Sequence, residues 1–158
     1  MCSSDLAKDA LPAHHERARL RPLSAEELLA ALKLISGDPA AKTDGVTVEY
    51  FTRYFGEPLN GQGDFQGRLS EHLFLNNSDN VRAFLRRKKG NFADALLTAT
   101  DPWEQRVDRL FLTVLSRPPT AAERARFVAH LQSDPKSEPL VEEALWALVN
   151  TSEFRFNH

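Results

Sequence analysis

The strongest concentration of charge in this 158-residue sequence is a basic run near its middle. Clustered guanidinium and ammonium groups can hold phosphates, so one interpretation is a weak nucleic-acid binder. The other is a helix C-terminus, where cations offset the helix dipole. We favour the second interpretation, because 20 Lys and Arg against 22 Asp and Glu leave a net charge of -2 and no overall basic field. The run comprises Arg82, Arg86, Arg87, Lys88 and Lys89.

Proton transfer is the second chemistry to consider, and His72 is its candidate. A histidine acts as a general base when a carboxylate orients its ring. No carboxylate close in sequence is placed to do so, and we therefore expect a buried, hydrogen-bonded histidine. His14 and His15 are adjacent, and adjacent side chains diverge on a helix, so we expect no metal site there.

The sequence carries no recognised catalytic or cofactor motif. There is no H-E-x-x-H, no phosphate-binding loop, no dinucleotide-binding glycine pattern and no nucleophile elbow. The single cysteine, Cys2, excludes an internal disulfide, a thiolate zinc site and a CxxCH haem attachment within this sequence. We therefore predict no catalytic, cofactor-binding or metal-binding residue here.

The elements that would position these residues are helices. Hydrophobic residues make up 42% of the chain, enough for one sizeable core, and they recur at helical rather than strand spacing. Proline and glycine fall almost entirely between the apolar stripes, where helices end. No apolar run is long enough for a membrane span. We predict an all-α fold, a compact irregular bundle of about seven or eight short helices.

Capping signals mark where several of these helices begin and end. Ser24 with Glu27, and Thr120 with Glu123, have the spacing of capping boxes. Gly37 would supply a left-handed C-terminal cap. A helix capped at residue 78 or 79 would run to Gly90 and would contain the basic run.

The apolar stripes predict which residues of the later helices face the core. Phe92, Ala95 and Leu96 mark a short helix, and Trp103 begins the longest stripe, over residues 103–115. Earlier in the chain, a further helix is predicted over residues 65–77. In the helix after Thr120, the residues expected to face inward are Ala121, Ala125, Phe127, Val128 and Leu131.

The N-terminal residues 1–22 are predicted to be a flexible lead-in to a single helical domain at 23–158. The first six residues match the translation of a common sequencing adapter, and we interpret Met1 to Leu6 as an artefact. No signal peptide is visible, because the first twenty residues contain charges and no continuous apolar stretch. The compartment therefore remains open from this sequence.

Three spaced motifs resemble a known family. They are residues 21–32 (RPLSAEELLAAL), residues 115–123 (LSRPPTAAE) and residues 146–158 (WALVNTSEFRFNH). Together they resemble the C-terminal part of the family called domain of unknown function 1553, which is abundant in planctomycetes. The resemblance covers about residues 21–158.

The resemblance implies the last module of a larger, exported or periplasmic protein. Haem c would belong only to a missing upstream segment, and no catalytic residue of the family can be carried over to this chain. Some signature residues are polar and adjoin the apolar last helix, where burial without partners would cost about 1 to 3 kcal/mol each. We expect a polar cluster that docks the tail on the bundle: Asn150, Glu153, Asn157 and His158, with His72 as a further candidate.

Three functions remain open on these grounds. The first is a non-catalytic helical docking or structural module whose partners are upstream domains of the same protein or another protein. The second is part of an enzyme acting on surface polysaccharide, with most of the site upstream. The third is weak nucleic-acid binding through residues 82–89, which we disfavour.

Overall fold

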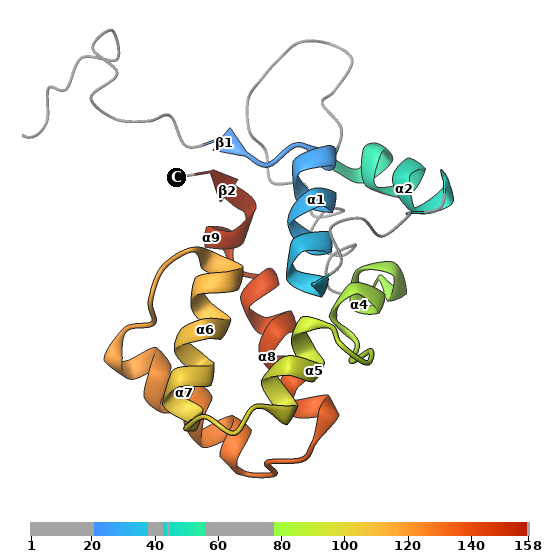
Figure 1. Ribbon diagram of the computed structural model, residues 1–158. Coiled ribbons are helices and arrows are strands. Elements are labelled where there is room, and N and C mark those ends of the chain that lie inside the picture. Colours follow the sequence, from blue (N-terminus) through green and yellow to red (C-terminus); the bar gives the residue numbers. More distant parts are fainter. Residues whose placement is uncertain (1–20, 38–42, 44, 56–77, 158) are drawn as a thin grey trace, which may run out of the picture.

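The computed structural model describes residues 21–37, 43, 45–55 and 78–157 (Figure 1). These residues form eight helices and one short two-stranded ribbon, which confirms the all-α compact bundle. The helices are α1 (Ala25–Ser36), α2 (Gly45–Phe55), α4 (Asp79–Leu85), α5 (Phe92–Thr98), α6 (Trp103–Leu115), α7 (Ala121–Gln132), α8 (Glu138–Val149) and α9 (Ser152–Arg155). The helix predicted at 65–77 lies outside the described residues.

Helix α1 begins and ends as its sequence predicts. The Ser24 hydroxyl accepts a hydrogen bond from the Glu27 backbone N–H at 3.2 Å, and the Ser24 N–H donates to the Glu27 carboxylate at 2.9 Å. Gly37 ends the helix with a φ of 79°, the left-handed conformation that glycine adopts without strain. A Cβ at Gly37 would also lie 3.0 Å from the backbone nitrogen of Phe92, so the glycine allows α5 to approach.

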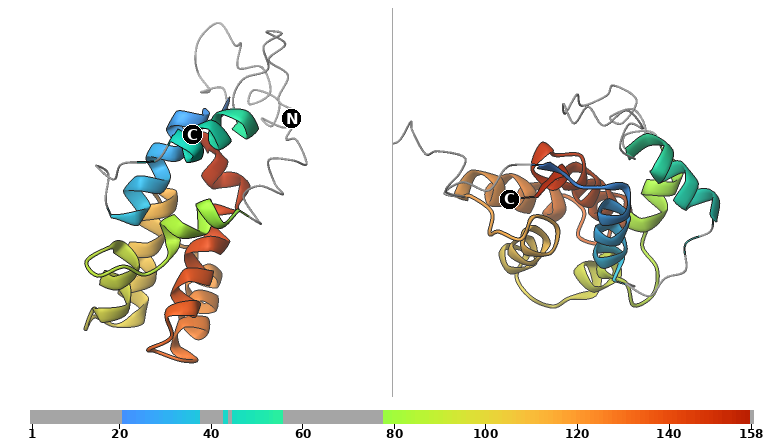
Figure 2. Two further views of the ribbon diagram at one scale, coloured as in Figure 1. Left: turned by 90° about the vertical axis from the view of Figure 1, so that its right-hand side faces the viewer. Right: turned by 90° about the horizontal axis from the view of Figure 1, so that it is seen from above.

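Helix α8 lies at the centre of the core and contacts α4, α5, α6 and α7. The apolar stripe of α6 is buried as predicted from Val107 to Leu115, while Trp103 at its start is only partly buried. Phe111 is fully buried and meets the partly buried ring of Phe127 of α7 edge-on, with centroids 5.0 Å apart. Figure 2 shows α2 at the side of the molecule opposite α7.

Two of the predicted apolar faces are wrong in detail. In α5, Ala93 and Leu96 are buried and Ala95 is exposed. In α7, Ala121 and Ala125 are exposed and Leu131 is the buried residue. Alanine contributes little apolar area to either face, so larger neighbours decide which side of a helix packs against the core.

The helix that was expected to reach Gly90 ends earlier. Helix α4 stops at Leu85, and Arg86 has extended backbone angles (φ -60°, ψ 140°). The Asn91 side chain donates to the Arg86 carbonyl at 2.8 Å, and the Arg87 N–H donates to the Glu142 carboxylate of α8 at 3.0 Å. These contacts satisfy the backbone outside the helix, so residues 86–90 form a connection rather than a helical turn.

The two ends of the described fold lie side by side (Figure 1). Strand β1 (Arg21–Pro22) pairs antiparallel with β2 (Phe156–Asn157), and Arg21 is opposite Asn157. The Leu23 N–H also donates to the Arg155 carbonyl at 2.8 Å. The buried Arg155 guanidinium lies 4.9 Å from the centroid of the Phe55 ring, which connects α9 to α2. The chain therefore enters the domain beside the segment that completes it.

Candidate functional site

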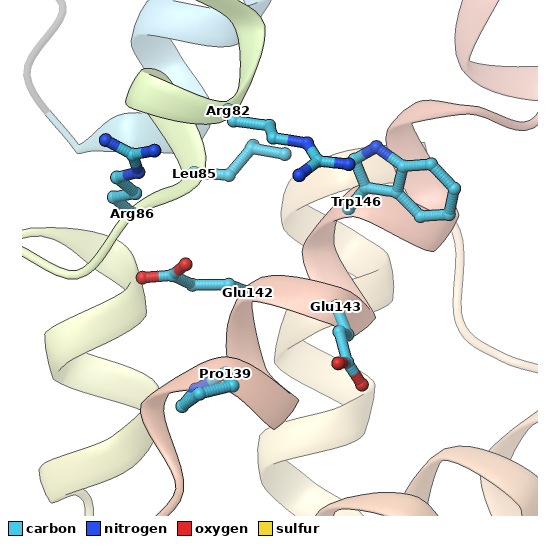
Figure 3. A pocket seen from close by; sticks show the side chains of 7 residues that line it. All are labelled: Arg82, Leu85, Arg86, Pro139, Glu142, Glu143 and Trp146. Carbon is cyan, nitrogen blue, oxygen red and sulfur yellow. The ribbon is translucent and has the colours of Figure 1, made fainter. Parts of the chain in front are cut away.

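A groove of about 360 Å³ lies between α4 and α8 (Figure 3). Helix α4 and the residue after it supply one wall, and the first three turns of α8 supply the other. Cationic and apolar side chains come from α4, and carboxylates and an indole from α8. The lining residues are Arg82, Leu85, Arg86, Pro139, Glu142, Glu143 and Trp146.

Two cations of the predicted basic run line this groove. Arg82 and Arg86 are exposed, and neither guanidinium forms an ion pair with a described residue. Figure 3 shows the Arg82 side chain reaching toward the Trp146 indole. The Trp146 Nε1 atom is buried and has no hydrogen-bond partner among the described residues. Both side chains line the groove.

Arg87, the central residue of the basic run, is engaged in a structural network instead. Its Nε donates to Asp94 of α5 at 2.7 Å, and its Nη1 pairs with Glu138 of α8. The hydrogen bond that Arg87 donates to Asp94 raises the pKa of Arg87, and the contact with Glu138 adds to the shift. The hydrogen bond from the Gly90 N–H lowers the pKa of the Asp94 carboxyl most, and the hydrogen bond from Arg87 lowers it further. Arg87 therefore joins α5 to α8 and is not available to a phosphate without breaking these pairs.

The rest of the basic run agrees only in part with the helix-dipole interpretation. Because α4 ends at Leu85, Arg82 is the cation in its last turn. Lys88 and Lys89 are exposed in the connection to α5. The five cations thus divide into one structural residue, two that line a groove and two on the surface.

A second ionic cluster forms around Arg117, in the connection between α6 and α7. Its Nε and Nη2 atoms lie 2.5 Å and 2.8 Å from the two carboxylate oxygens of Glu153 in α9. Its Nη1 and Nη2 atoms also lie 3.0 Å and 2.9 Å from the oxygens of Glu123 in α7. We call Arg117, Glu123 and Glu153 the arginine latch, because one guanidinium holds two helices that are distant in sequence.

The latch is built on the helix cap that the sequence predicts. Thr120 accepts from the Glu123 N–H at 3.3 Å, and the Thr120 N–H donates to the Glu123 carboxylate at 2.7 Å. The hydrogen bond from Arg117, supported by both Thr120 contacts, lowers the pKa of Glu123 to about 2. Glu123 and then Glu153 raise the pKa of Arg117. The guanidinium carbon of Arg117 lies over the Phe111 ring, 5.6 Å from the ring centroid.

The predicted polar cluster is only partly described. Glu153 pairs with Arg117, in the connection between α6 and α7. The Asn150 amide donates to the Trp146 carbonyl at 2.8 Å and closes the end of α8. Asn157 lies in β2, where its backbone pairing is described. His158 and His72 lie outside the described residues.

Two important residues did not stand out as a site in the sequence. Arg117 is part of a motif quoted above, where it precedes two prolines as a turn residue, and its partner Glu153 lies 36 positions away. Trp146 looks like a flank residue of a buried helix. A lone arginine beside a capping box, with a glutamate in the following tail, is the one available signal for the latch.

Neither a metal site nor a membrane span is found in the described part of the chain. No three His, Cys, Asp or Glu side chains among residues 21–37, 43, 45–55 and 78–157 are placed to hold a metal ion. No described helix is long and apolar enough to cross a membrane.

No protein-family model, curated protein or solved structure matches this chain.

Proposed function

We propose that this domain is a non-catalytic helical docking module at the C-terminus of an exported multidomain protein of the domain of unknown function 1553 type. The observation that carries the proposal is the arginine latch. Its strongly shifted ionisable groups face one another and join α7, α9 and the turn at Arg117. Charge at this point of the fold serves to hold helices together.

The same use of charge recurs elsewhere in the described residues. Arg87 joins α5 to α8, and Arg124 of α7 pairs with Asp108 of α6 at 2.7 Å. Shifted pKa values often mark active sites, where the shifted group must face a substrate. Here, the groups with shifted pKa values point at structural partners, which favours a structural module over the polysaccharide-enzyme alternative.

The arrangement of the ends favours upstream domains of the same chain as the partner. Strand β1 brings the chain into the fold directly beside β2 and α9. A domain preceding β1 would leave from the face that the latch stabilises. Docking on that face would then fix the orientation of the two domains.

Cross-linking of the intact full-length protein tests this proposal. The gene is read upstream of Ala7, its whole product is expressed, and lysine and carboxylate cross-links are mapped by mass spectrometry. We expect reproducible cross-links between the upstream domain and the residues around β1, β2 and α9. Cross-links confined to each domain would contradict docking, and hydrolysis of surface polysaccharide by the 158-residue chain would contradict a non-catalytic role.

A further inference from the structure

We propose that the groove between α4 and α8 binds an acidic peptide segment of a protein partner, with a carboxylate held by Arg82 and Arg86. This inference rests on the proposed docking function and names a surface and a partner chemistry for it. The latch and the β1–β2 ribbon are not part of this surface.

The guanidinium groups of Arg82 and Arg86 line the groove and are exposed, and neither forms an ion pair with a described residue. A guanidinium has donors only, so in the unbound domain these groups donate to water. A carboxylate suits both of them, since its bonds to a guanidinium are charge-assisted. The Trp146 side chain lines the same groove, so its indole signal reports on occupation of the groove.

The charges that line the groove differ between its two walls. The Glu142 carboxylate already accepts the Arg87 N–H at 3.0 Å, and it lies toward Arg86. Glu143 points away from Arg82 and has an oxygen 3.5 Å from His130 Nε2. The α4 wall is therefore cationic, while both carboxylates of the α8 wall have other partners nearby. This arrangement favours a single anionic side chain over a polyanion, which Glu142 and Glu143 would repel.

The size of the groove and its apolar lining also suit a short peptide segment. A volume of about 360 Å³ accommodates a few side chains, within the range of roughly 300 to 1,000 Å³ typical of ligand sites. Leu85 and Pro139 provide apolar surface next to the cations. A peptide that carries a glutamate or aspartate beside an apolar residue would use both parts.

Nuclear magnetic resonance of the indole N–H groups provides the test. The chain has two tryptophans, so it gives two indole signals, and Trp103→Phe assigns them. A capped peptide with a single glutamate between leucines is the probe, and the same peptide with glutamine is its control. We expect a saturable shift of the Trp146 signal with the glutamate peptide, while the Trp103 signal stays in place.

Matched arginine variants assign the binding to the groove. Arg82→Gln should weaken binding by roughly tenfold or more, equivalent to about 1.4 kcal/mol. Arg126→Gln removes an equal charge from an exposed position on α7 and should leave binding unchanged. An unresponsive Trp146 signal, an equal response to the glutamine peptide, or unchanged binding in Arg82→Gln would overturn the inference.

Two further probes test the identity of the occupant. Glutarate that binds as tightly as the peptide would overturn a peptide occupant, and a single-stranded DNA oligomer that binds more tightly would overturn an acidic protein partner. The cross-linking experiment separates the two proposals. Inter-domain cross-links without a Trp146 response would contradict peptide binding in the groove and support the docking module. A Trp146 response without inter-domain cross-links would contradict the upstream domain as the docking partner.

Discussion

The arginine latch and the α4–α8 groove both contain arginines, but these arginines have opposite roles. Arg117 meets two carboxylates within 3.0 Å and connects helices, whereas Arg82 and Arg86 have no ion-pair partner among the described residues. The Trp146 Nε1 atom, in the same groove, also has no hydrogen-bond partner among the residues that the structure describes. Arginine content or local charge density alone would not distinguish these regions. The tertiary partners decide which charges hold the fold and which remain for a ligand.

The largest expected effect comes from removing the guanidinium of the latch. Arg117→Gln removes the guanidinium that both Glu123 and Glu153 contact, so we expect the free energy of unfolding to fall by about 2 kcal/mol. Arg82→Gln should leave the urea midpoint unchanged, because Arg82 makes no ion pair with a described residue. Urea unfolding of both variants measures the difference, and equal midpoints would remove the distinction between latch and groove.

A smaller and more local effect is expected for Glu153→Gln. The change weakens one half of the latch and keeps the cap of α7, so about 1 kcal/mol should be lost. Amide hydrogen exchange should accelerate in α9 and β2 before it does in α6. Uniform acceleration along the whole chain would show that Glu153 does not act specifically on the C-terminal segment.

Acid should weaken the latch in a defined pH range. Glu123 has a pKa near 4.5 in the unfolded chain and about 2 in the fold, so the unfolded state binds more protons between these values. Its contribution to stability is complete above about pH 4.5 and is lost as the pH falls toward 2. The pH dependence of urea unfolding should be shallower in Arg117→Gln. An unchanged slope would contradict the assigned cause of the shift.

Salt should affect the groove more than the latch. Raising the ionic strength from about 0.05 M to about 0.5 M screens exposed charges, while paired and partly buried charges are screened less. We expect weaker binding of the glutamate peptide and little change in the difference in unfolding free energy between the protein and Arg117→Gln. Calorimetry and urea unfolding at both ionic strengths measure these quantities.

Local features of the fold could be predicted from the sequence. The capping boxes at Ser24 and Thr120 and the left-handed cap at Gly37 depend on neighbouring residues, and the structure has them. The apolar stripe of α6 is also correct beyond Trp103, because large side chains at helical spacing leave one face to bury. Ala95, which contributes little area, is on the exposed side instead.

Features that depend on distant partners could not be predicted. The end of α4 at Leu85 depends on the contact of Arg87 with Glu142, 55 positions away. Glu153 was expected to act in docking the tail, but its partner Arg117 is fixed only by the packing of α6, α7 and α9. The groove likewise requires α4 and α8 to lie together, which no spacing within either helix reveals.

A double-mutant cycle between Arg117→Gln and Glu153→Gln, measured by urea unfolding, tests most directly whether the latch holds the C-terminal segment on the bundle. We predict that the two changes are not additive, with a coupling free energy of about 1 kcal/mol or more. A coupling within roughly 0.3 kcal/mol of zero would contradict the account, because it would mean that the two side chains contribute to stability independently.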